Sequence, residues 1–223
     1  MADREAKAAL FDAFAQVGKG LSSGRRIELL DVLANGERSV EALAGQTGMS
    51  LANTSQHLQL LRQAGLVAMR RHGTFVFYRL ASPRVLDLCR ALRAQAAAEL
   101  AEVERLAAAY LGGDGDEELE PVSRQELARR LEQGDGLVVV DVRPAEEYAV
   151  GHIPGALSVP LDELRRRIAE LPADQEIVAY CRGPYCAFAP EAVRLLRAAG
   201  RAARRLEDGL PEWAAAGLPV ARA

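Results

Sequence analysis

Cysteine is scarce in this sequence, because three residues in 223 cannot form the disulfide framework of a small secreted domain. Long apolar runs are also missing: no stretch approaches the roughly 18 apolar residues of a membrane-spanning helix. Residues 1–5 are mostly charged and lead into no apolar segment, so we expect no signal peptide. Together these absences predict a cytoplasmic protein without membrane contact, in a reducing compartment where a free thiol stays usable.

Charge and composition change part-way along the chain. The overall composition, 49% hydrophobic and 26% charged residues, is typical of a globular protein. Residues 1–111 are slightly basic, whereas residues 112–223 are acidic. At the start of the second part, residues 112–120 combine glycine with like charges and cannot pack a core. We therefore predict two domains, 1–111 and 121–223, joined by an acidic, glycine-rich linker over 112–120.

The first domain has the pattern of helices interrupted by a hairpin. Apolar residues recur at helical spacing over 4–17. Residues 67–80 indicate two strands around a turn at Gly73, and residues 83–111 indicate one long helix of about 40 Å. Three shorter helices are predicted in between, with N-caps at Ser22 or Ser23, Ser39 and Ser50, and ends at Asn35-Gly36, Gly48 and Gly65.

The second domain alternates between apolar runs and helical patterns. Valine-rich or apolar runs at 137–141 and 176–181 predict buried strands, and a third strand is expected near 202–206. Such alternation is typical of a parallel sheet covered by helices. The fold class is thus a mainly α winged helix-turn-helix domain followed by an α/β domain with a parallel sheet. The helices of the second domain are predicted at 123–132, 145–148, 161–170 and 190–199.

Two helices joined at Gly48 and followed by a hairpin indicate DNA binding. Short polar side chains on the second helix can reach base edges or phosphates, and nearby arginines can neutralise phosphates. For His57, a structural hydrogen bond is an equal alternative to a base contact. The candidate contacts to double-stranded DNA are Ser50, Asn53, Thr54, Gln56, His57, Arg62, Arg70 and Arg71.

The run from Ser50 to Val67, with its Ser-x-His-Leu core and Ala-Gly-Leu-Val exit, resembles the ArsR/SmtB family of bacterial repressors. The resemblance covers roughly residues 5–110 and implies a homodimer, with each recognition helix in a major groove and each wing on the backbone or minor groove. Residues 41–47 hold no thiol or histidine, unlike the corresponding helix of the family's metal sensors. The only cysteine of this domain, Cys89, is either a small buried hydrophobe or a thiol at the dimer interface.

Cys181 lies between an apolar run at 177–180 and a helical pattern that begins near Glu191. A strand, a tight turn and a helix in this order place the sulfur above a helix N-terminus, where negative charge is favoured. We therefore predict a lowered pKa for the Cys181 thiol and a nucleophilic thiolate. Arg182 can add positive charge beside an anionic sulfur donor. The candidate catalytic residues are Cys181, Arg182, Gly183, Pro184, Tyr185 and Cys186.

Residues 121–223 resemble a single rhodanese (sulfurtransferase) domain. The resemblance implies that Cys181 takes a sulfane sulfur from a donor such as thiosulfate or a persulfide, and passes it on to an acceptor. Asp141, Arg143 and His152 are expected to brace loops rather than to touch substrate. The matching segments are 140–143, 147–148, 151–156, Cys181, 206–210, Trp213 and 217–220.

The cysteine loop departs from many rhodaneses, because Pro184 replaces a glycine and Cys186 replaces an arginine. The lost positive charge weakens the case for thiosulfate as donor. Cys186 is either a resolving thiol, which would give a disulfide or a bridging sulfur, or a small packing residue. Its spacing from Cys181 argues against a zinc knuckle, and we expect neither metal nor cofactor. A phosphatase or arsenate-reductase loop is disfavoured because Ala187 and Phe188 follow it.

Two functions stay open on the sequence alone. The first is a DNA-binding transcriptional regulator whose rhodanese domain forms a cysteine persulfide and senses or relays reactive sulfur. The alternative is a sulfurtransferase enzyme whose helical half serves mainly for dimerisation or tethering. In both, Cys181 is expected to carry rhodanese-type chemistry.

Overall fold

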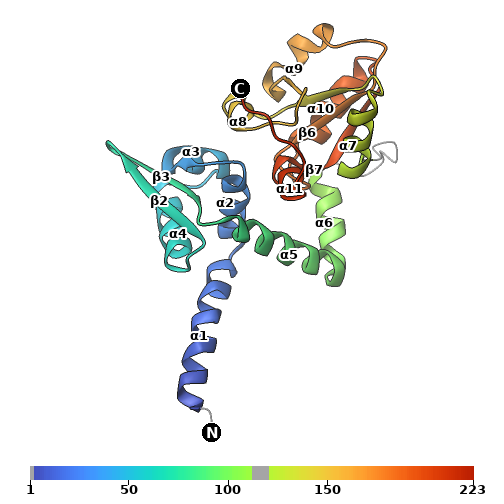
Figure 1. Cartoon of the computed structure of the whole chain (residues 1–223). Coiled ribbons are helices and arrows are strands. Elements are labelled where there is room, and N and C mark those ends of the chain that lie inside the picture. Colours follow the sequence, from blue (N-terminus) through green and yellow to red (C-terminus); the bar gives the residue numbers. More distant parts are fainter. Residues whose placement is uncertain (1–2, 112–120) are drawn as a thin grey trace. The chain divides into compact units, whose positions relative to one another are not determined.

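The computed structural model describes residues 3–111 and 121–223, and the chain divides into two compact units (Figure 1). The first unit covers Met1–Gln95 and the second covers Ala96–Ala223. The predicted linker, 112–120, lies outside the described residues. Within the described part of the chain, no helix is both long enough and apolar enough to cross a membrane.

The first unit packs helices against a small antiparallel sheet with strand order β1-β3-β2. Its core joins leucines of three helices, among them Leu29, Leu43 and Leu58. The hairpin turns at Gly73, whose φ of 61° is a left-handed conformation that favours glycine. The elements are α1 (Arg4–Leu21), α2 (Gly24–Ala34), β1 (Arg38–Ser39), α3 (Val40–Thr47), α4 (Leu51–Gln63), β2 (Val67–His72), β3 (Phe75–Leu80) and the start of α5 (Pro83–Glu99).

Serine caps start two of these helices, as the sequence predicts. The side chains of Ser39 and Ser50 accept hydrogen bonds from first-turn backbone N–H groups at 3.2 and 3.3 Å. Gly48 ends α3 with a φ of 63°. Helix α2 differs, because Ser23 precedes it without a side-chain capping bond.

The prediction of one long helix over 83–111 is wrong. The structure has α5 and then α6 (Ala101–Leu111), with only Leu100 between them. The Leu100 N–H still donates to the carbonyl oxygen of Ala96 at 2.9 Å, so the break is confined to one residue. The sequence carries no stop signal there, since residues 84–111 contain neither glycine nor proline.

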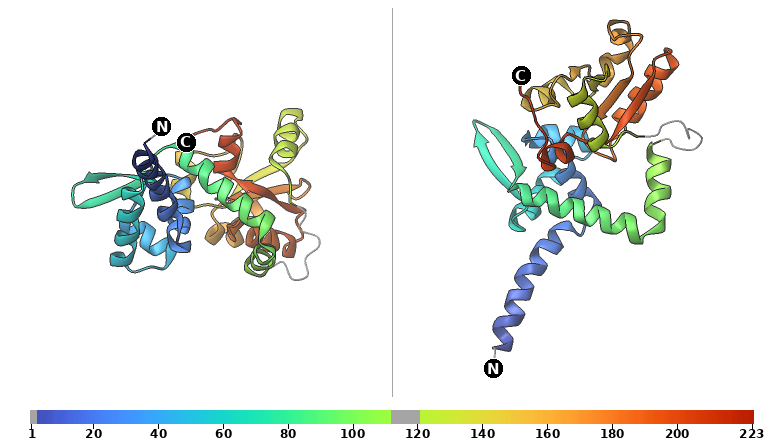
Figure 2. Two further views of the ribbon diagram at one scale, coloured as in Figure 1. Left: turned by 90° about the horizontal axis from the view of Figure 1, so that it is seen from below. Right: turned by 45° about the vertical axis from the view of Figure 1, so that its right-hand side comes forward.

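The second unit is built on a four-stranded parallel sheet with strand order β5-β4-β6-β7 (Figure 2). Leu164 and Val193 lie in the core that α9 and α10 form on one face, and Leu127 and Trp213 lie in the core of α7 and α11 on the other. The elements after α6 are α7 (Arg124–Gln133), β4 (Val138–Asp141), α8 (Ala145–Val150), β5 (Leu157–Ser158), α9 (Leu161–Arg167), the 3-10 turn η1 (Ile168–Glu170), β6 (Ile177–Cys181), α10 (Phe188–Ala198), β7 (Ala203–Gly209) and α11 (Leu210–Ala215).

Strand β6 places its cysteine by simple alternation. Ile177, Ala179 and Cys181 belong to the core beneath α10, whereas Val178 and Tyr180 belong to the opposite core. The strands are parallel, so their carboxyl ends meet at one edge of the sheet, where α/β proteins commonly bind ligands. Cys181 ends β6 at that edge.

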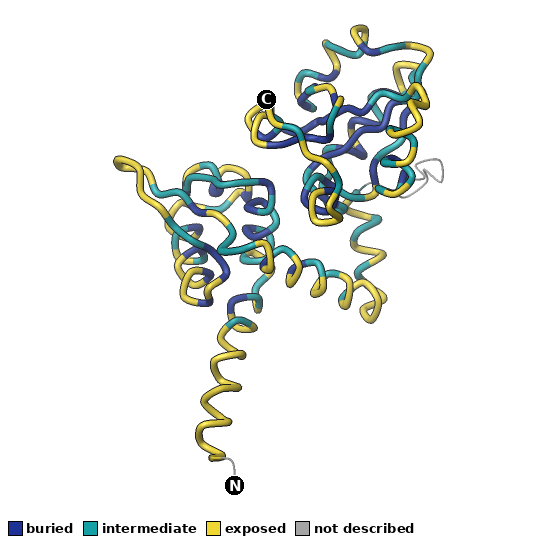
Figure 3. Tube along the Cα trace, in the orientation of Figure 1, coloured by how far each residue is buried: buried dark blue, intermediate teal, exposed yellow. Residues whose placement is uncertain are grey.

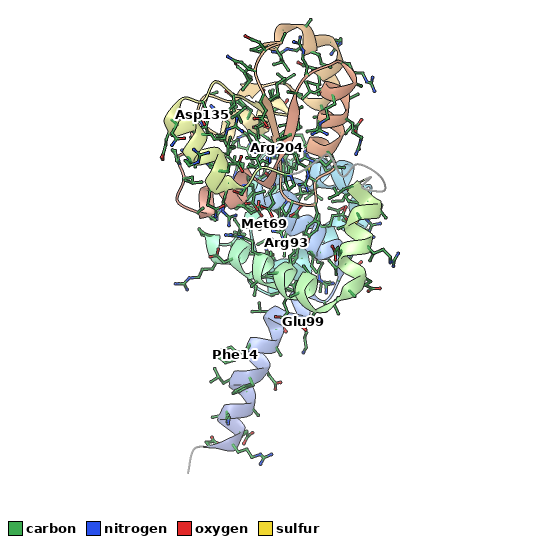
Figure 4. All side chains as sticks on the ribbon, turned by 90° about the vertical axis from the view of Figure 1, so that its right-hand side faces the viewer. Phe14, Met69, Arg93, Glu99, Asp135 and Arg204 are labelled. Carbon is green, nitrogen blue, oxygen red and sulfur yellow. The ribbon has the colours of Figure 1, made fainter. Side chains whose placement is uncertain are left out.

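Helix α1 is exposed along most of its length (Figure 3). Only its end packs closely: Gly20 is buried, and a Cβ there would lie 2.6 Å from the Cβ of Ala64. Leu10, Phe11 and Phe14 are 52%, 58% and 61% exposed, and Phe14 projects from the helix (Figure 4). An apolar stripe of this kind is typical of a surface that contacts another molecule.

Candidate sulfur-transfer and DNA-binding sites

Cys181 lies at the base of a short loop that ends at Cys186. Its side chain is 2% exposed. The Sγ lies 3.5 Å from the carbonyl oxygen of Cys186 and 3.9 Å from that of Gly183. A backbone hydrogen bond from the Cys186 N–H to the Gly183 carbonyl, 3.1 Å long, closes the turn. The sulfur of Cys181 is thus enclosed by its own loop.

The two thiols of the loop differ in their pKa values. Burial raises the pKa of the Cys181 thiol well above its ordinary value. The neighbouring Cys181 thiol, together with backbone N–H groups and the Arg182 charge, lowers the pKa of Cys186 to about 7. The expectation that Cys181 itself is the low-pKa thiolate is therefore wrong.

Arg182 is directed toward Glu147, a partner that the sequence pattern did not indicate. Its Nη2 donates to Oε1 of Glu147 at 2.7 Å and its Nε donates at 3.1 Å. The guanidinium also lies 4.9 Å from the ring centre of Phe188. Since the Glu147 side chain is 2% exposed, a buried carboxylate balances the positive charge beside the thiols.

A buried network braces the sheet edge behind the loop. Asp141 and Arg143 form an ion pair at 2.5 Å, with side chains that are 0% and 1% exposed. The Tyr180 hydroxyl donates to Asp141 at 2.6 Å, and burial raises the pKa of Tyr180, so it stays a protonated donor. Arg143 also donates to the carbonyl of Gly151 at 2.7 Å. These contacts leave Asp141 and Arg143 no access to substrate.

His152 belongs to the same bracing. Its ring stacks on that of Tyr148 with centroids 3.7 Å apart, and its Nδ1 lies 3.0 Å from the Tyr148 carbonyl oxygen. Its backbone pairs with Ala221. The expectation that Asp141, Arg143 and His152 hold loops is confirmed.

Gly209, at the end of β7, lets the cysteine loop pass close to the strand. A Cβ at this position would lie 2.3 Å from the carbonyl carbon of Arg182 and from the nitrogen of Gly183. Its φ of −117° is open to any residue, so space rather than backbone conformation requires glycine. Sequence reasoning placed Gly209 only within a matching segment and gave it no role.

An open hollow of about 600 Å³ lies between α8, α9 and α10. Phe188, whose ring contacts the Arg182 guanidinium, is one of its lining residues. Four carboxylates and one guanidinium surround it, so its net charge disfavours a dianion. Among the described residues, no three His, Cys, Asp or Glu side chains lie together as metal ligands. The charged lining residues are Glu146, Asp162, Glu163, Glu191 and Arg165, and the apolar ones include Val142, Leu161 and Leu195.

The first unit presents a helix-turn-helix made of α3 and α4, followed by the β2–β3 wing. Asn53 and Gln56 are exposed on α4. His57 is half-buried, and none of the described residues hydrogen-bonds to its buried Nδ1. The structure thus shows no structural hydrogen bond at the Nδ1 of His57 within the described part of the chain.

Thr54 and Ser50 have local roles. The expectation that Thr54 lies on the exposed face is wrong, because its side chain is fully buried and its Oγ1 donates to the Ser50 carbonyl at 3.0 Å. Ser50 is exposed and caps α4 through its hydroxyl. Only Ser50 of the two remains accessible to DNA.

The arginines near the wing differ in their partners. Arg70 forms an ion pair with Glu37 at 2.5 Å, and its guanidinium lies 4.6 Å from the ring centre of Phe77. Arg62 is exposed, with its Nη1 3.9 Å from the sulfur of Met69. Arg71 is exposed and has no ion pair among the described residues. The charges of Arg62 and Arg71 are thus the more available ones.

Cys89, on α5, packs inside the core of the first unit. It is 7% exposed, and burial raises its pKa. The interpretation of Cys89 as a small buried hydrophobe is confirmed.

Comparison with known proteins assigns both halves of the chain. Residues 23–68 match the model of the arsR family of bacterial regulatory proteins, and residues 123–216 match that of the rhodanese-like domain. The HTH-type transcriptional regulator Rv0324 of Mycobacterium tuberculosis is 52% identical over 214 residues, which span 96% of this chain and 92% of that protein. The chain belongs to the arsR family.

In this arsR-family protein a rhodanese-like domain follows the winged helix-turn-helix domain, as both resemblances indicate. A sulfurtransferase of Allochromatium vinosum is 32% identical over 99 residues, covering 44% of this chain and 92% of that protein. A solved Mycobacterium bovis domain, described as a homodimeric winged helix-turn-helix DNA-binding domain, is 47% identical. It covers 46% of this chain and 93% of its own, with a TM-score of 0.42.

Proposed function

We propose that this arsR-family protein is a DNA-binding transcriptional regulator that takes up sulfane sulfur at Cys181 and changes its DNA affinity in response. The supporting observation is an enclosed pair of thiols, Cys181 and Cys186, in the same chain as an exposed recognition helix. The neighbouring Cys181 thiol lowers the pKa of Cys186 to about 7, so the loop would hold a thiolate nucleophile under ordinary conditions.

Double-stranded DNA is the proposed partner of the first unit. Asn53 and Gln56 are exposed amides of the kind that pair with base edges, chiefly adenine. Arg62 and Arg71 would neutralise phosphates. Ser50 and His57 border this surface, and Arg70 would contribute less because Glu37 balances its charge. Thr54 is excluded by its burial.

We further propose a homodimer that acts on the DNA in the cytoplasm. The apolar side chains exposed on α1 and α5, among them Phe11, Phe14, Leu88 and Leu92, would be covered by a second copy. A two-fold dimer presents two recognition helices and calls for a palindromic site.

A persulfide is the proposed sulfur donor, in preference to thiosulfate. Thiosulfate is a dianion that needs unbalanced positive charge, and Glu147 balances Arg182. Cys186 occupies a place where many rhodaneses have an arginine, and the nearby hollow is acidic. Rhodanese-type transfer from a persulfide to a thiol acceptor would run through Cys181.

The test is operator affinity of the full-length protein with and without glutathione persulfide. Genomic fragments captured by the reduced protein supply the operator. We expect a change of about 5- to 150-fold in wild type and in Cys89→Ser, and none in Cys181→Ser. Unchanged wild-type affinity would reject the sensor.

A sulfurtransferase enzyme is the second candidate, favoured by the match to nearly all of the Allochromatium vinosum sulfurtransferase. It predicts catalytic sulfur transfer to cyanide or a thiol acceptor with unchanged DNA affinity. Measuring both quantities on one preparation separates the two functions.

A further inference from the structure

We propose that Cys186 resolves the Cys181 persulfide, so that the loop ends as a Cys181–Cys186 disulfide and the sulfur leaves as sulfide. The loop would then have a further activity, the reduction of sulfane sulfur, and the lasting signal would be a disulfide. This inference rests on the proposed uptake of sulfur at Cys181.

The geometry already brings the two residues together. The Sγ of Cys181 lies 3.5 Å from the backbone oxygen of Cys186. The bond from the Cys186 N–H to Gly183 holds the two ends of the loop in this arrangement. A resolving attack therefore needs movement only within one loop.

The charge around the pair suits such an attack. The neighbouring Cys181 thiol, two backbone N–H groups and the Arg182 charge stabilise the thiolate form of Cys186. Cys186 is half-buried whereas Cys181 is 2% exposed, so competing external thiols meet Cys186 first. A thiolate next to a persulfide reacts faster within the loop than a thiol arriving from solution.

The chemistry proceeds in two balanced steps. The proton of Cys181 passes to the Cys186 thiolate, and the Cys181 sulfur attacks the outer sulfur of a hydropersulfide, RSSH. The sulfur–sulfur bond of the donor breaks, and RS⁻ leaves and takes up the proton from Cys186. The Cys186 thiolate then attacks the Sγ of Cys181, and HS⁻ leaves.

The electrons also balance without an external oxidant. The two protein thiols are oxidised to a disulfide, and the sulfane sulfur of the donor is reduced to sulfide. A bridging sulfur retained between Cys181 and Cys186 would need a second oxidising equivalent, so the proposal does not include it.

The experiment treats the full-length protein with one equivalent of glutathione persulfide under anaerobic conditions. Free thiols are then alkylated, intact masses are recorded and released sulfide is measured. We expect wild type and Cys89→Ser to lose two hydrogen atoms and to release one sulfide per chain. Cys186→Ser and Cys186→Ala should gain one sulfur atom and release no sulfide, and Cys181→Ser should do neither.

The outcomes separate this inference from the function on which it rests. A wild-type protein that keeps one added sulfur and releases no sulfide overturns the inference and leaves sulfur uptake intact. If neither wild type nor either Cys186 variant reacts, sulfur uptake itself is refuted. Sulfur gained by Cys181→Ser would reverse the assigned roles and also overturn the inference. The wild-type sulfide measurement stands even where a variant fails to fold.

Discussion

Arg182, the residue that follows Cys181, forms a two-pronged ion pair with Glu147, with nitrogen–oxygen distances of 2.7 and 3.1 Å to one carboxylate oxygen. The Glu147 carboxylate balances the charge of the Arg182 guanidinium. The Arg182 charge still contributes to lowering the pKa of Cys186. In the proposed function, Glu147 would therefore affect both the pKa of Cys186 and the choice of sulfur donor. This relationship can be tested directly.

Glu147→Gln should leave Arg182 without its balancing charge. We expect the pKa of Cys186 to fall below about 7, and sulfur loading from thiosulfate to increase relative to a persulfide. Breaking a buried pair should also cost about 3–5 kcal/mol of unfolding free energy. The measurements are alkylation rate against pH and urea unfolding. The matched control is Glu146→Gln, an exposed neighbour on α8, and an equal shift there would contradict the assignment.

Limited alkylation of wild type should label Cys186 before the other two cysteines. Only the thiolate reacts, so the rate should rise with pH through about 7 and level off above it. Cys181 and Cys89 have raised pKa values and are buried, so both should react later. Peptide mapping by mass spectrometry follows each site. Labelling of Cys181 first would show that the charge of the pair resides there instead.

Asp141→Asn should destabilise the second unit by about 3–5 kcal/mol, because it leaves the buried Arg143 charge without its partner. Urea unfolding can be followed by the fluorescence of Trp213, the only tryptophan, which lies in the core of that unit. Glu163→Gln removes a half-exposed pair with Arg167 and should cost about 0–1 kcal/mol. An equal loss of unfolding free energy in the two variants would contradict the bracing role of Asp141.

Gly209→Ala should displace the cysteine loop. The added methyl would meet the backbone of Arg182 and Gly183 at 2.3 Å, and neither position can yield without moving the loop. We expect sulfur loading at Cys181 to fall at least about tenfold, the loss that misplacement of a reacting group produces. The control is Gly45→Ala, whose added Cβ has no neighbour within 4 Å. Normal loading by Gly209→Ala would mean that the loop tolerates this shift.

In the recognition helix, Asn53→Ala and Gln56→Ala should each weaken specific binding by about 1–3 kcal/mol and leave random DNA nearly unaffected. Arg71→Ala should weaken both kinds of binding and flatten the salt dependence. Arg70→Ala should have a smaller effect because Arg70 is already paired with Glu37. Binding titrations at several salt concentrations measure each effect. The control is Arg129→Ala, an exposed charge of the second unit.

The sequence predicts those features that depend on local pattern. Ser39 and Ser50 as caps, the turn at Gly73 and the alternation along β6 all depend on residues close together in the chain. The two-residue strands β1 and β5 are too short to show the alternation of a strand. Helix α11 is too short to show a clear helical spacing of apolar residues. Each of these short elements depends on tertiary contacts for its existence.

The site residues show the same division. The position of Cys181 at a strand end follows from sequence, but its acidity depends on the partner thiol and on burial. Glu147 lies 35 residues before Arg182, and no local pattern pairs them. The burial of Thr54 likewise depends on how α4 packs, which the polarity of its side chain did not reveal. Long-range pairing, rather than residue type, decides these outcomes.

In the proposed homodimer, helix α1 would make the order of the N-terminal segment depend on protein concentration. A mostly exposed helix of 18 residues is marginal in water by itself, since helices are stabilised mainly by packing of an apolar face. If a second copy covers Leu10, Phe11 and Phe14, dilution will unwind this helix while the rest of the unit stays folded. The cellular abundance of the protein would then set how much of it is competent to bind a two-fold DNA site.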